Sequence, residues 1–500
     1  MLLGIALHAS LSFFPWVWPV HDDTSSIDGP FDEFFHAVHG FRMPLFFLLS
    51  GFFTALLWRR KGLTNLLTHR VKRIAVPLAI GMVTIVPAVT WSVGWAVDNS
   101  ISDYVEEHSD IWAAVFFGNA DAVDAILDDG VDVNTPNESD ENNTPLHIAA
   151  YTNDVEITEL LLARGADPAA MALGGTPIDF AVFMGNEDVA EVLVASGAPD
   201  PRPTEGTWTD VGFWAVGASE AIETADVLGL ESWLNSFYHL WFLWFLLWLV
   251  AGFAVVALAA DRFGGHGTGP ASWTGLVMWA LIPAALMPQL LMGESGSIPV
   301  FGPDTSTGLL PTPHVLAYYG VFFSFGALLY GRKNRTGGLL VESIGKWWIV
   351  LLPVGLLAVF PLAMRLTFEW EGATWLQASV AQVTYAWLII FGMMGLFRSF
   401  LATERRGVRH LSDSSYWLYL IHLPMVIIAQ SWIRHWDLPA WVKFTGLTVA
   451  VAVVALVTYQ LFVRYTSIGT LLNGKRTRPA VLQRQARAQT MKSHESDLAV

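Results

Sequence analysis

Residues 36–58 read HAVHGFRMPLFFLLSGFFTALLW, an apolar run with one permanent charge, at Arg42. A helix of about 20 such residues crosses the hydrocarbon core of a lipid bilayer. Nine other apolar runs lie before and after it, at residues 1–18, 74–97, 236–260, 272–292, 314–331, 346–364, 380–401, 415–433 and 441–463. The sequence therefore predicts an all-α polytopic membrane bundle of about ten transmembrane helices.

The composition of the 500-residue chain agrees with a membrane protein. Hydrophobic residues make up 53% of it and charged residues 14%, against roughly 25% charged residues in a typical soluble domain. The chain contains no Cys, which excludes a disulfide, a thiol nucleophile and a thiolate metal site. A purely soluble protein, a disordered chain and a disulfide-stapled secreted domain are all excluded.

Charge is distributed unevenly along the chain, whose net charge is −16. Residues 98–233 hold 28 acidic and 2 basic residues, and the rest of the chain holds 16 acidic and 26 basic ones. We interpret 98–233 as an acidic extramembrane insert between two membrane parts, 1–97 and 234–465. The basic tail 466–500 is expected to be disordered and cytoplasmic. The acidic insert argues against a nucleic-acid partner.

Basic residues also predict the orientation, because Lys and Arg concentrate in cytoplasmic loops. With a cytoplasmic N-terminus, the inside segments hold 22 of the 28 basic residues. These segments are 59–73, 261–271, 332–346, 398–409 and the tail from 464. We therefore expect a multi-pass protein of the cell (inner) membrane with both termini cytoplasmic and the insert extracytoplasmic.

The acidic insert contains an internal repeat. The motif TPLH at 144–147 returns as TPID at 176–179, and Gly130, Gly165 and Gly197 close successive units where a helix end needs a left-handed residue. Apolar residues at helical spacing lie between these marks. The pattern resembles ankyrin repeats, with three copies at about 110–203, and implies a possible protein partner for the array.

Ionisable side chains fall inside several of the predicted spans, at His8, Arg42, His239 and His422. Burying such a group in a bilayer is costly, so each is a candidate functional residue. His8 lies in the middle of the first run, too far from the membrane surface for its ring to reach water. A neutral imidazole at that depth suits a general base.

The structural alternatives for the other histidines stay open. His239 could belong to an interfacial aromatic belt. His422 could form a helix–helix hydrogen bond that Ser415 and Tyr419 share. His36 and His39 lie on one helix face as metal ligands do, but the sequence offers no third ligand. We therefore predict no metal site.

A basic pair precedes the third span, at Arg70 and Arg73. Three residues apart, the two guanidinium groups could form a fork for phosphates. An ordinary positively charged cytoplasmic flank explains them equally well.

Together these segments resemble the integral-membrane acyltransferase type 3 family, close to its glucan-modifying C-protein branch. The resemblance covers 1–97 and 234–465. It rests on His8, the block FRMPLFFLLSGFF at 41–53, Arg70 with Arg73, HLWFL at 239–243 and YWLYLIHLP at 416–424.

The resemblance implies an O-acyltransferase that uses acyl-CoA as donor substrate, binds no cofactor, and acylates a carbohydrate or lipid-linked hydroxyl. His8 would be the catalytic base or acyl relay. Arg70 and Arg73 would hold the donor phosphates. The rest of the implied site consists of Arg42, Ser50, Ser415, His239 and His422, of which Arg42 and Ser50 line the path and the two histidines complete the polar core.

Two features depart from the family pattern. Members usually carry an Arg or Lys further upstream of the first-span histidine than this sequence extends, so either the true start lies upstream or that role is lost. No small-residue cleavage site precedes Asp22 and Asp23, and we expect the first run to remain as a helix. The ankyrin insert is the second departure.

Two functions from other classes compete with an enzyme. In a proton-coupled transporter, the buried histidines and arginine would form a relay. Carriers usually show repeats between their halves, and none is visible here. In a membrane-anchored ankyrin receptor the spans would only anchor the array, which does not require so many polar residues within them.

Overall fold

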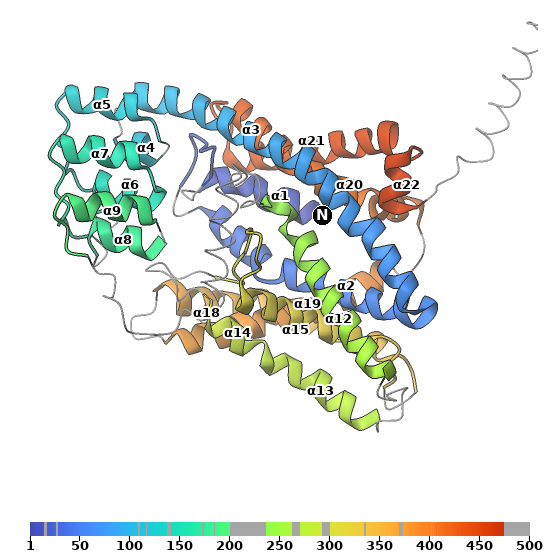
Figure 1. Ribbon diagram of the computed structural model, residues 1–500. Coiled ribbons are helices and arrows are strands. Elements are labelled where there is room, and N and C mark those ends of the chain that lie inside the picture. The colour runs from blue at the N-terminus through green and yellow to red at the C-terminus, as the bar shows by residue number, and fades with distance from the viewer. Residues whose placement is uncertain are drawn as a thin grey trace, which may run out of the picture.

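The computed structural model describes residues 1–14, 18–26, 29–108, 111–116, 118–137, 142–172, 175–184, 186–200, 237–262, 271–292, 301–334, 337–369, 374–401, 403 and 405–474. Every regular element within these ranges is a helix, with no β-strand among them (Figure 1). The predicted all-α class is therefore confirmed. Residues 201–236 of the insert and 475–500 of the tail lie outside the described ranges.

All ten predicted apolar runs contain helix. The elements are α1 (Leu2–Ser10), α2 (Pro30–Arg70), α3 (Val76–His108), α12 (Trp241–Arg262), α13 (Ala271–Ala284), α14 (Leu286–Leu290), α15 (Pro313–Leu329), α17 (Trp348–Val354), α18 (Phe360–Met364), α19 (Trp375–Leu401), α20 (Arg406–Ile433) and α21 (Ala440–Thr458). A π-helical turn, Gly355–Val359, connects α17 with α18, so that these two form one span.

Among the described residues, six helical stretches are long and apolar enough to cross a membrane. They are Pro30–Val97, Tyr238–Ala259, Trp348–Phe368, Trp375–Leu401, Gly407–Ile433 and Ala440–Val463. The first contains two predicted spans, because the chain changes direction at Gly62, where φ is 77°. Beyond this turn, Arg70 donates a 2.7 Å hydrogen bond to Thr54 Oγ1 before it. Shorter apolar helices occur at Leu2–Phe13, Gly275–Leu290 and Pro313–Leu329.

The first helix is shorter than the predicted span 1–18. After α1, a 3₁₀ turn, Leu11–Phe13, ends at Phe14, whose backbone is extended (φ −142°, ψ 153°). The next residue is Pro15, and a residue before proline is forced out of the helical region. α1 packs against α2, α20 and α21. This short helix therefore lies inside the bundle.

Close backbone contact joins α2 to α15. A Cβ atom on Gly51 would lie 1.9 Å from Phe323 O, and one on Gly326 would lie 1.9 Å from Leu48 O. Small residues let membrane helices approach until their backbones touch. Gly51, within the block at 41–53, therefore allows the backbone of α2 to contact the backbone of α15.

The ankyrin array continues from the far end of α3, which runs past the predicted insert boundary at residue 97 to His108. Its helices pair as α4 (Ile111–Phe116) with α5 (Ala120–Asp128), α6 (Pro145–Thr152) with α7 (Val155–Ala163), and α8 (Pro177–Met184) with α9 (Glu187–Ala195). They stack beside the membrane bundle (Figure 1) around their own apolar core, which includes Val123, Leu146, Leu161 and Leu193.

The tail differs from its prediction at one point. Residues 466–500 are predicted to be disordered, yet Ser467–Asn473 form the helix α22. Gly469 packs on the carbonyl of Val463, where an added Cβ atom would lie only 2.1 Å away. Asn473 also donates a 2.6 Å hydrogen bond to Asp413 O of α20. These contacts hold the short helix against α20 and the residues that precede it.

Candidate active site

His8 and His422 meet inside the helix bundle. His8 is carried by α1 and His422 by α20, and His8 Nδ1 lies 2.9 Å from His422 Nε2. The ring centroids are 5.0 Å apart. On its other side, His422 Nδ1 lies 2.8 Å from Tyr419 O. Two of the histidines selected from the sequence therefore form a direct pair.

These hydrogen bonds assign the tautomer of each ring. A carbonyl oxygen only accepts, so the proton between His422 and Tyr419 belongs to His422 Nδ1. His422 Nε2 is then the acceptor, and His8 Nδ1 donates to it. A neutral His8 keeps its lone pair on Nε2, which bonds no protein atom in the described part of the chain. His8 Nε2 is therefore the nitrogen that can take up a proton.

Trp18 and Gln430 hold His8 from two further directions, and neither was selected from the sequence. The Trp18 ring stacks on His8, with centroids 6.0 Å apart, and its Nε1 donates to Gln430 Oε1 at 2.8 Å. Gln430 Nε2 donates to the carbonyl oxygens of His8 and Ala9, at 3.0 and 3.3 Å. These carbonyls belong to the last turn of α1, where intrahelical donors run out. For Gln430, the sequence signal that could have identified it is an amide side chain within an apolar helix.

His239 completes a cluster with this pair. Its ring centroid lies 5.1 Å from that of His422, and its Nε2 donates to Leu420 O at 3.1 Å. The Tyr419 hydroxyl donates to His239 O at 2.6 Å. His239 Nδ1 is buried and has no hydrogen-bond partner among the residues described. The neutral ring thus presents a second buried lone pair beside His422.

A row of side chains on α20 connects the histidine cluster with the basic pair. Tyr416, Tyr419 and His422 follow at three-residue spacing, a length of about 9 Å along the helix. At the near end of this row, the Tyr416 hydroxyl donates to Arg73 O at 2.8 Å. Arg73 lies in a π-helical turn, Val71–Ala75, directly after Arg70. Arg70 and Arg73, which are predicted to hold the phosphates of acyl-CoA, therefore lie at one end of the row. The histidines lie at the other end.

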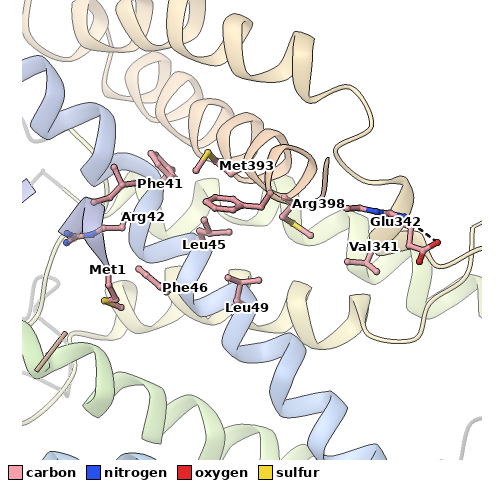
Figure 2. Close-up of a pocket in the computed structure, with 13 residues that line it drawn as sticks. Met1, Phe41, Arg42, Leu45, Phe46, Leu49, Val341, Glu342, Met393 and Arg398 are labelled. Atoms are coloured by element: carbon pink, nitrogen blue, oxygen red, sulfur yellow. Dashed lines mark ion pairs between the residues drawn. The ribbon is translucent and has the colours of Figure 1, made fainter. Parts of the chain in front are cut away.

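Arg42 lines one end of an apolar pocket of about 630 Å³ (Figure 2). Its guanidinium group is beside Gly4, where an added Cβ atom would be 3.3 Å from Nη1. Gly4 is one helical turn before His8. The buried Nε of Arg42 has no hydrogen-bond partner among the described residues, and no carboxylate of that part of the chain pairs with this side chain.

The two predicted serines lie outside the histidine cluster. Ser415 Oγ donates to Ser412 O of its own helix at 2.8 Å. Ser50 is half-buried beside Gly51, and its carbonyl accepts a 2.7 Å hydrogen bond from Thr54 Oγ1. Ser50 thus shares the Thr54 side chain with Arg70.

His36 and His39 make separate contacts. His36 Nε2 pairs with Asp32 at 3.1 Å, whereas His39 Nε2 donates to Pro303 O at 3.0 Å. Within the described ranges, no group of three or more His, Asp or Glu side chains is arranged to hold a metal ion.

Two family models match the chain. One described as an acyltransferase domain covers residues 1–138 and 192–460, and one for ankyrin repeats, in 3 copies, covers residues 111–204. Helices long and apolar enough to cross a membrane, together with the first match, define a membrane-embedded acyltransferase. Since that match covers most of the chain, the protein belongs to the type 3 acyltransferase family, with an inserted ankyrin-repeat domain.

Similar proteins carry the name glucans biosynthesis protein C. The one from Escherichia coli (strain K12) is 37% identical over 91 residues, which are 18% of this chain and 22% of the relative. The one from Salmonella paratyphi B is 34% identical over 113 residues, or 22% of this chain and 26% of the relative. The chain thus matches about a quarter of the length of these curated relatives.

Proposed function

We propose that the protein transfers an acyl group, such as acetyl or succinyl, from a cytoplasmic acyl-CoA to a hydroxyl group of a glycan or other extracytoplasmic acceptor. The observation that carries this proposal is the His8–His422 pair, which leaves the Nε2 lone pair of His8 open. Membership in the acyltransferase family supports the reaction class. The name shared by the relatives supports a glucan acceptor.

In the proposed mechanism, His8 acts as general base. Its Nε2 takes the proton of the acceptor hydroxyl, and the hydroxyl oxygen attacks the thioester carbonyl carbon. The carbon–sulfur bond then breaks, and the CoA thiolate takes the proton back from His8. Arg42 of α2, whose guanidinium group lies beside Gly4, one helical turn before His8, stabilises the negative carbonyl oxygen of the intermediate. His422 keeps His8 in the reactive tautomer and His239 adds a lone pair for the acceptor hydroxyl.

The donor binds at the other end of the α20 row. Arg70 and Arg73 hold the CoA phosphates through charge-assisted hydrogen bonds, while Ser415, next to Tyr416, adds a hydroxyl there. Ser50 and Arg42 line the way toward His8. The short basic loops support a cytoplasmic location for this end and an extracytoplasmic one for the ankyrin array, because Lys and Arg are retained in cytoplasmic loops.

The test is acyl transfer by membrane vesicles that contain the protein. Vesicles are supplied with radiolabelled acetyl-CoA or succinyl-CoA and an extracytoplasmic glycan fraction, and labelled ester is quantified. We expect label in the glycan, and we expect His8→Ala to lower the rate roughly 100-fold to 10,000-fold, the usual contribution of a general base.

The matched control is His435→Ala, because His435 is an exposed histidine that pairs with Asp23. This variant is expected to behave as the wild-type protein. Near-full activity of His8→Ala, in protein that reaches the membrane normally, would overturn the assignment of His8.

A further inference from the structure

The pocket beside α2 has apolar walls and the Arg42 side chain at one end. Its lining residues are Met1, Leu3, Phe41, Arg42, Leu45, Phe46, Leu49, Val341, Glu342, Met393, Met394, Phe397 and Arg398. Arg42 lies at one end, and Glu342 and Arg398 lie at the other, with 3.7 Å between their charged groups (Figure 2). Leu49 is about 10 Å further along α2 than Arg42. The pocket therefore has the length along α2 and the apolar lining to hold an extended chain with a polar group at its Arg42 end.

We propose that this pocket holds the alkyl chain of the donor's acyl group, so that thioesters of medium-chain fatty acids are better donors than acetyl-CoA. The proposal rests on the function proposed above and names a wider donor class for the same site. The thioester carbonyl lies near Arg42 and His8, and the chain runs past Leu45 toward Leu49. In this reaction the thioester carbon–sulfur bond breaks, the ester carbon–oxygen bond forms, and the hydroxyl proton ends on the CoA thiol.

The lining selects an alkyl chain over the pantetheine arm of CoA. The arm carries amide groups, and a buried amide without a partner loses hydrogen bonds that it made with water. Between Arg42 and the Glu342–Arg398 pair, the lining side chains are Met, Leu, Phe and Val. Thioether and phenyl side chains adapt to an apolar ligand, and they offer an amide no strong partner.

Charge selects the acyl donor over a membrane phospholipid. A phospholipid keeps its phosphate at the membrane surface, so the methyl end of its chain would be the part that meets Arg42. That arrangement leaves the buried Nε of Arg42 without a hydrogen bond. An acyl group presents its carbonyl oxygen at this end.

The experiment compares donors of increasing chain length. The full-length protein in membrane vesicles is assayed with acetyl-, butyryl-, hexanoyl-, octanoyl- and decanoyl-CoA, and kcat/KM is measured for each. Burial of one methylene raises binding about fourfold, so kcat/KM should rise by about that factor per methylene until the pocket is filled.

Two variants of Leu49 are expected to shift this profile in opposite directions. Leu49→Trp narrows the pocket and lowers the octanoyl-to-acetyl ratio of kcat/KM, whereas Leu49→Ala moves the optimum to longer chains. The matched control is Phe53→Trp, one turn later on α2 at a side chain that is 54% exposed, which should keep the wild-type profile. A flat profile, or equal losses with all donors in Leu49→Trp, would overturn the proposal and assign the pocket to the pantetheine arm or to lipid.

A binding measurement separates failure of this inference from failure of the proposed function. Binding of acetyl-CoA and decanoyl-CoA to the protein in nanodiscs needs no turnover. If no donor is turned over but decanoyl-CoA binds more tightly and Leu49→Trp removes the difference, the chain site stands and the acyl-transfer proposal fails. If acetyl-CoA is turned over and both donors bind equally, the chain site fails and acyl transfer stands.

Discussion

His8 owes its protonation pattern to His422, a residue 414 positions away in the chain. The carbonyl of Tyr419 determines which nitrogen of His422 carries a proton, and His422 in turn determines which nitrogen of His8 keeps a lone pair. Each ring atom has one assignable role because a carbonyl can only accept. The reactivity proposed for His8 is therefore a property of the pair.

Gln430 supports this pair through the end of α1. We expect Gln430→Leu to lower kcat by about 100-fold, because a misplacement of about 1 Å in a reacting group costs that much. The leucine fills similar space but cannot bond the His8 and Ala9 carbonyls or Trp18. Kinetics with saturating acyl-CoA, together with the donor KM, measure the effect.

In the proposed mechanism the CoA phosphates bind at Arg70 and Arg73, away from Gln430. The KM of Gln430→Leu for the acyl-CoA donor should therefore stay near the wild-type value. Gln377→Leu, an exposed glutamine at the start of α19 that bonds the backbone of Thr374, is the control. A change in KM alone would show that Gln430 does not position His8.

At the scale of elements, two of the ankyrin repeats begin in the same way with different residues. In α6, His147 Nδ1 accepts hydrogen bonds from the backbone N–H of Thr144 and its hydroxyl, at 3.2 and 2.9 Å. In α8, Asp179 accepts the equivalent bonds from Thr176 at 2.8 and 2.7 Å. The departure of the third repeat from the TPLH motif thus preserves an acceptor at the helix start.

This difference predicts a pH-dependent stability of the second repeat. Burial lowers the pKa of His147 from its ordinary value of 6.5, so the unfolded repeat binds a proton more readily than the folded one. The stabilising contribution of neutral His147 is full above pH 6.5 and is lost as the pH falls through the lower folded-state pKa. We expect the hydrogen-exchange protection of Pro145–Thr152 to decrease as the pH falls below 6.5.

His147→Asp supplies the control, since it copies the acceptor of the third repeat. In this variant the protection should no longer decrease as histidine is protonated. Unchanged pH dependence would show that another group is responsible.

The turn between α2 and α3 carries the second element-scale prediction. Arg70→Ala with Arg73→Ala should raise the donor KM by at least about tenfold, because each charge-assisted hydrogen bond contributes about 1.5–3 kcal/mol. The acceptor KM should change little. Initial rates at varied donor and acceptor concentrations give both values.

The basic segment 59–73 also offers a charge-matched control, Arg60→Ala with Lys61→Ala, at two exposed positions of α2. This pair removes equal charge from the same basic segment. If both double variants raise the donor KM equally, Arg70 and Arg73 act only through the general charge of the loop.

At the scale of the whole molecule, α3 connects the membrane bundle with the ankyrin array. Its 33 residues extend about 50 Å, more than the roughly 30 Å thickness of a bilayer core. The end of α3 therefore projects from the membrane and carries the array on the side opposite the basic loops.

The absence of Cys from the chain allows a direct test of this topology. Ala169→Cys lies at an exposed position in the array and Thr403→Cys at an exposed position in the loop after α19. In intact cells, we expect a membrane-impermeant maleimide to label Ala169→Cys, and to label Thr403→Cys only after lysis. The reverse pattern would invert the assigned donor and acceptor sides.

The sequence by itself determined the helices, the repeats and the candidate residues. Apolar runs have to become helices in a bilayer because each backbone polar group needs a partner within its own segment. The TPLH and TPID motifs and the repeated glycines defined the array, because they mark where the helices of each repeat begin and end. His8, Arg42, His239 and His422 stood out because a polar group in an apolar run is costly to bury.

The tertiary structure decided which of these residues act together. Sequence spacing placed Ser415 with His422, yet Ser415 bonds its own helix, while Gln430 and Trp18 reach His8 from distant positions. Local periodicity assigns each residue to a face of its own helix and says nothing about which helix covers that face. That choice depends on close contacts such as Gly51 against Phe323, since membrane helices associate through packing and a few hydrogen bonds between residues far apart in the chain.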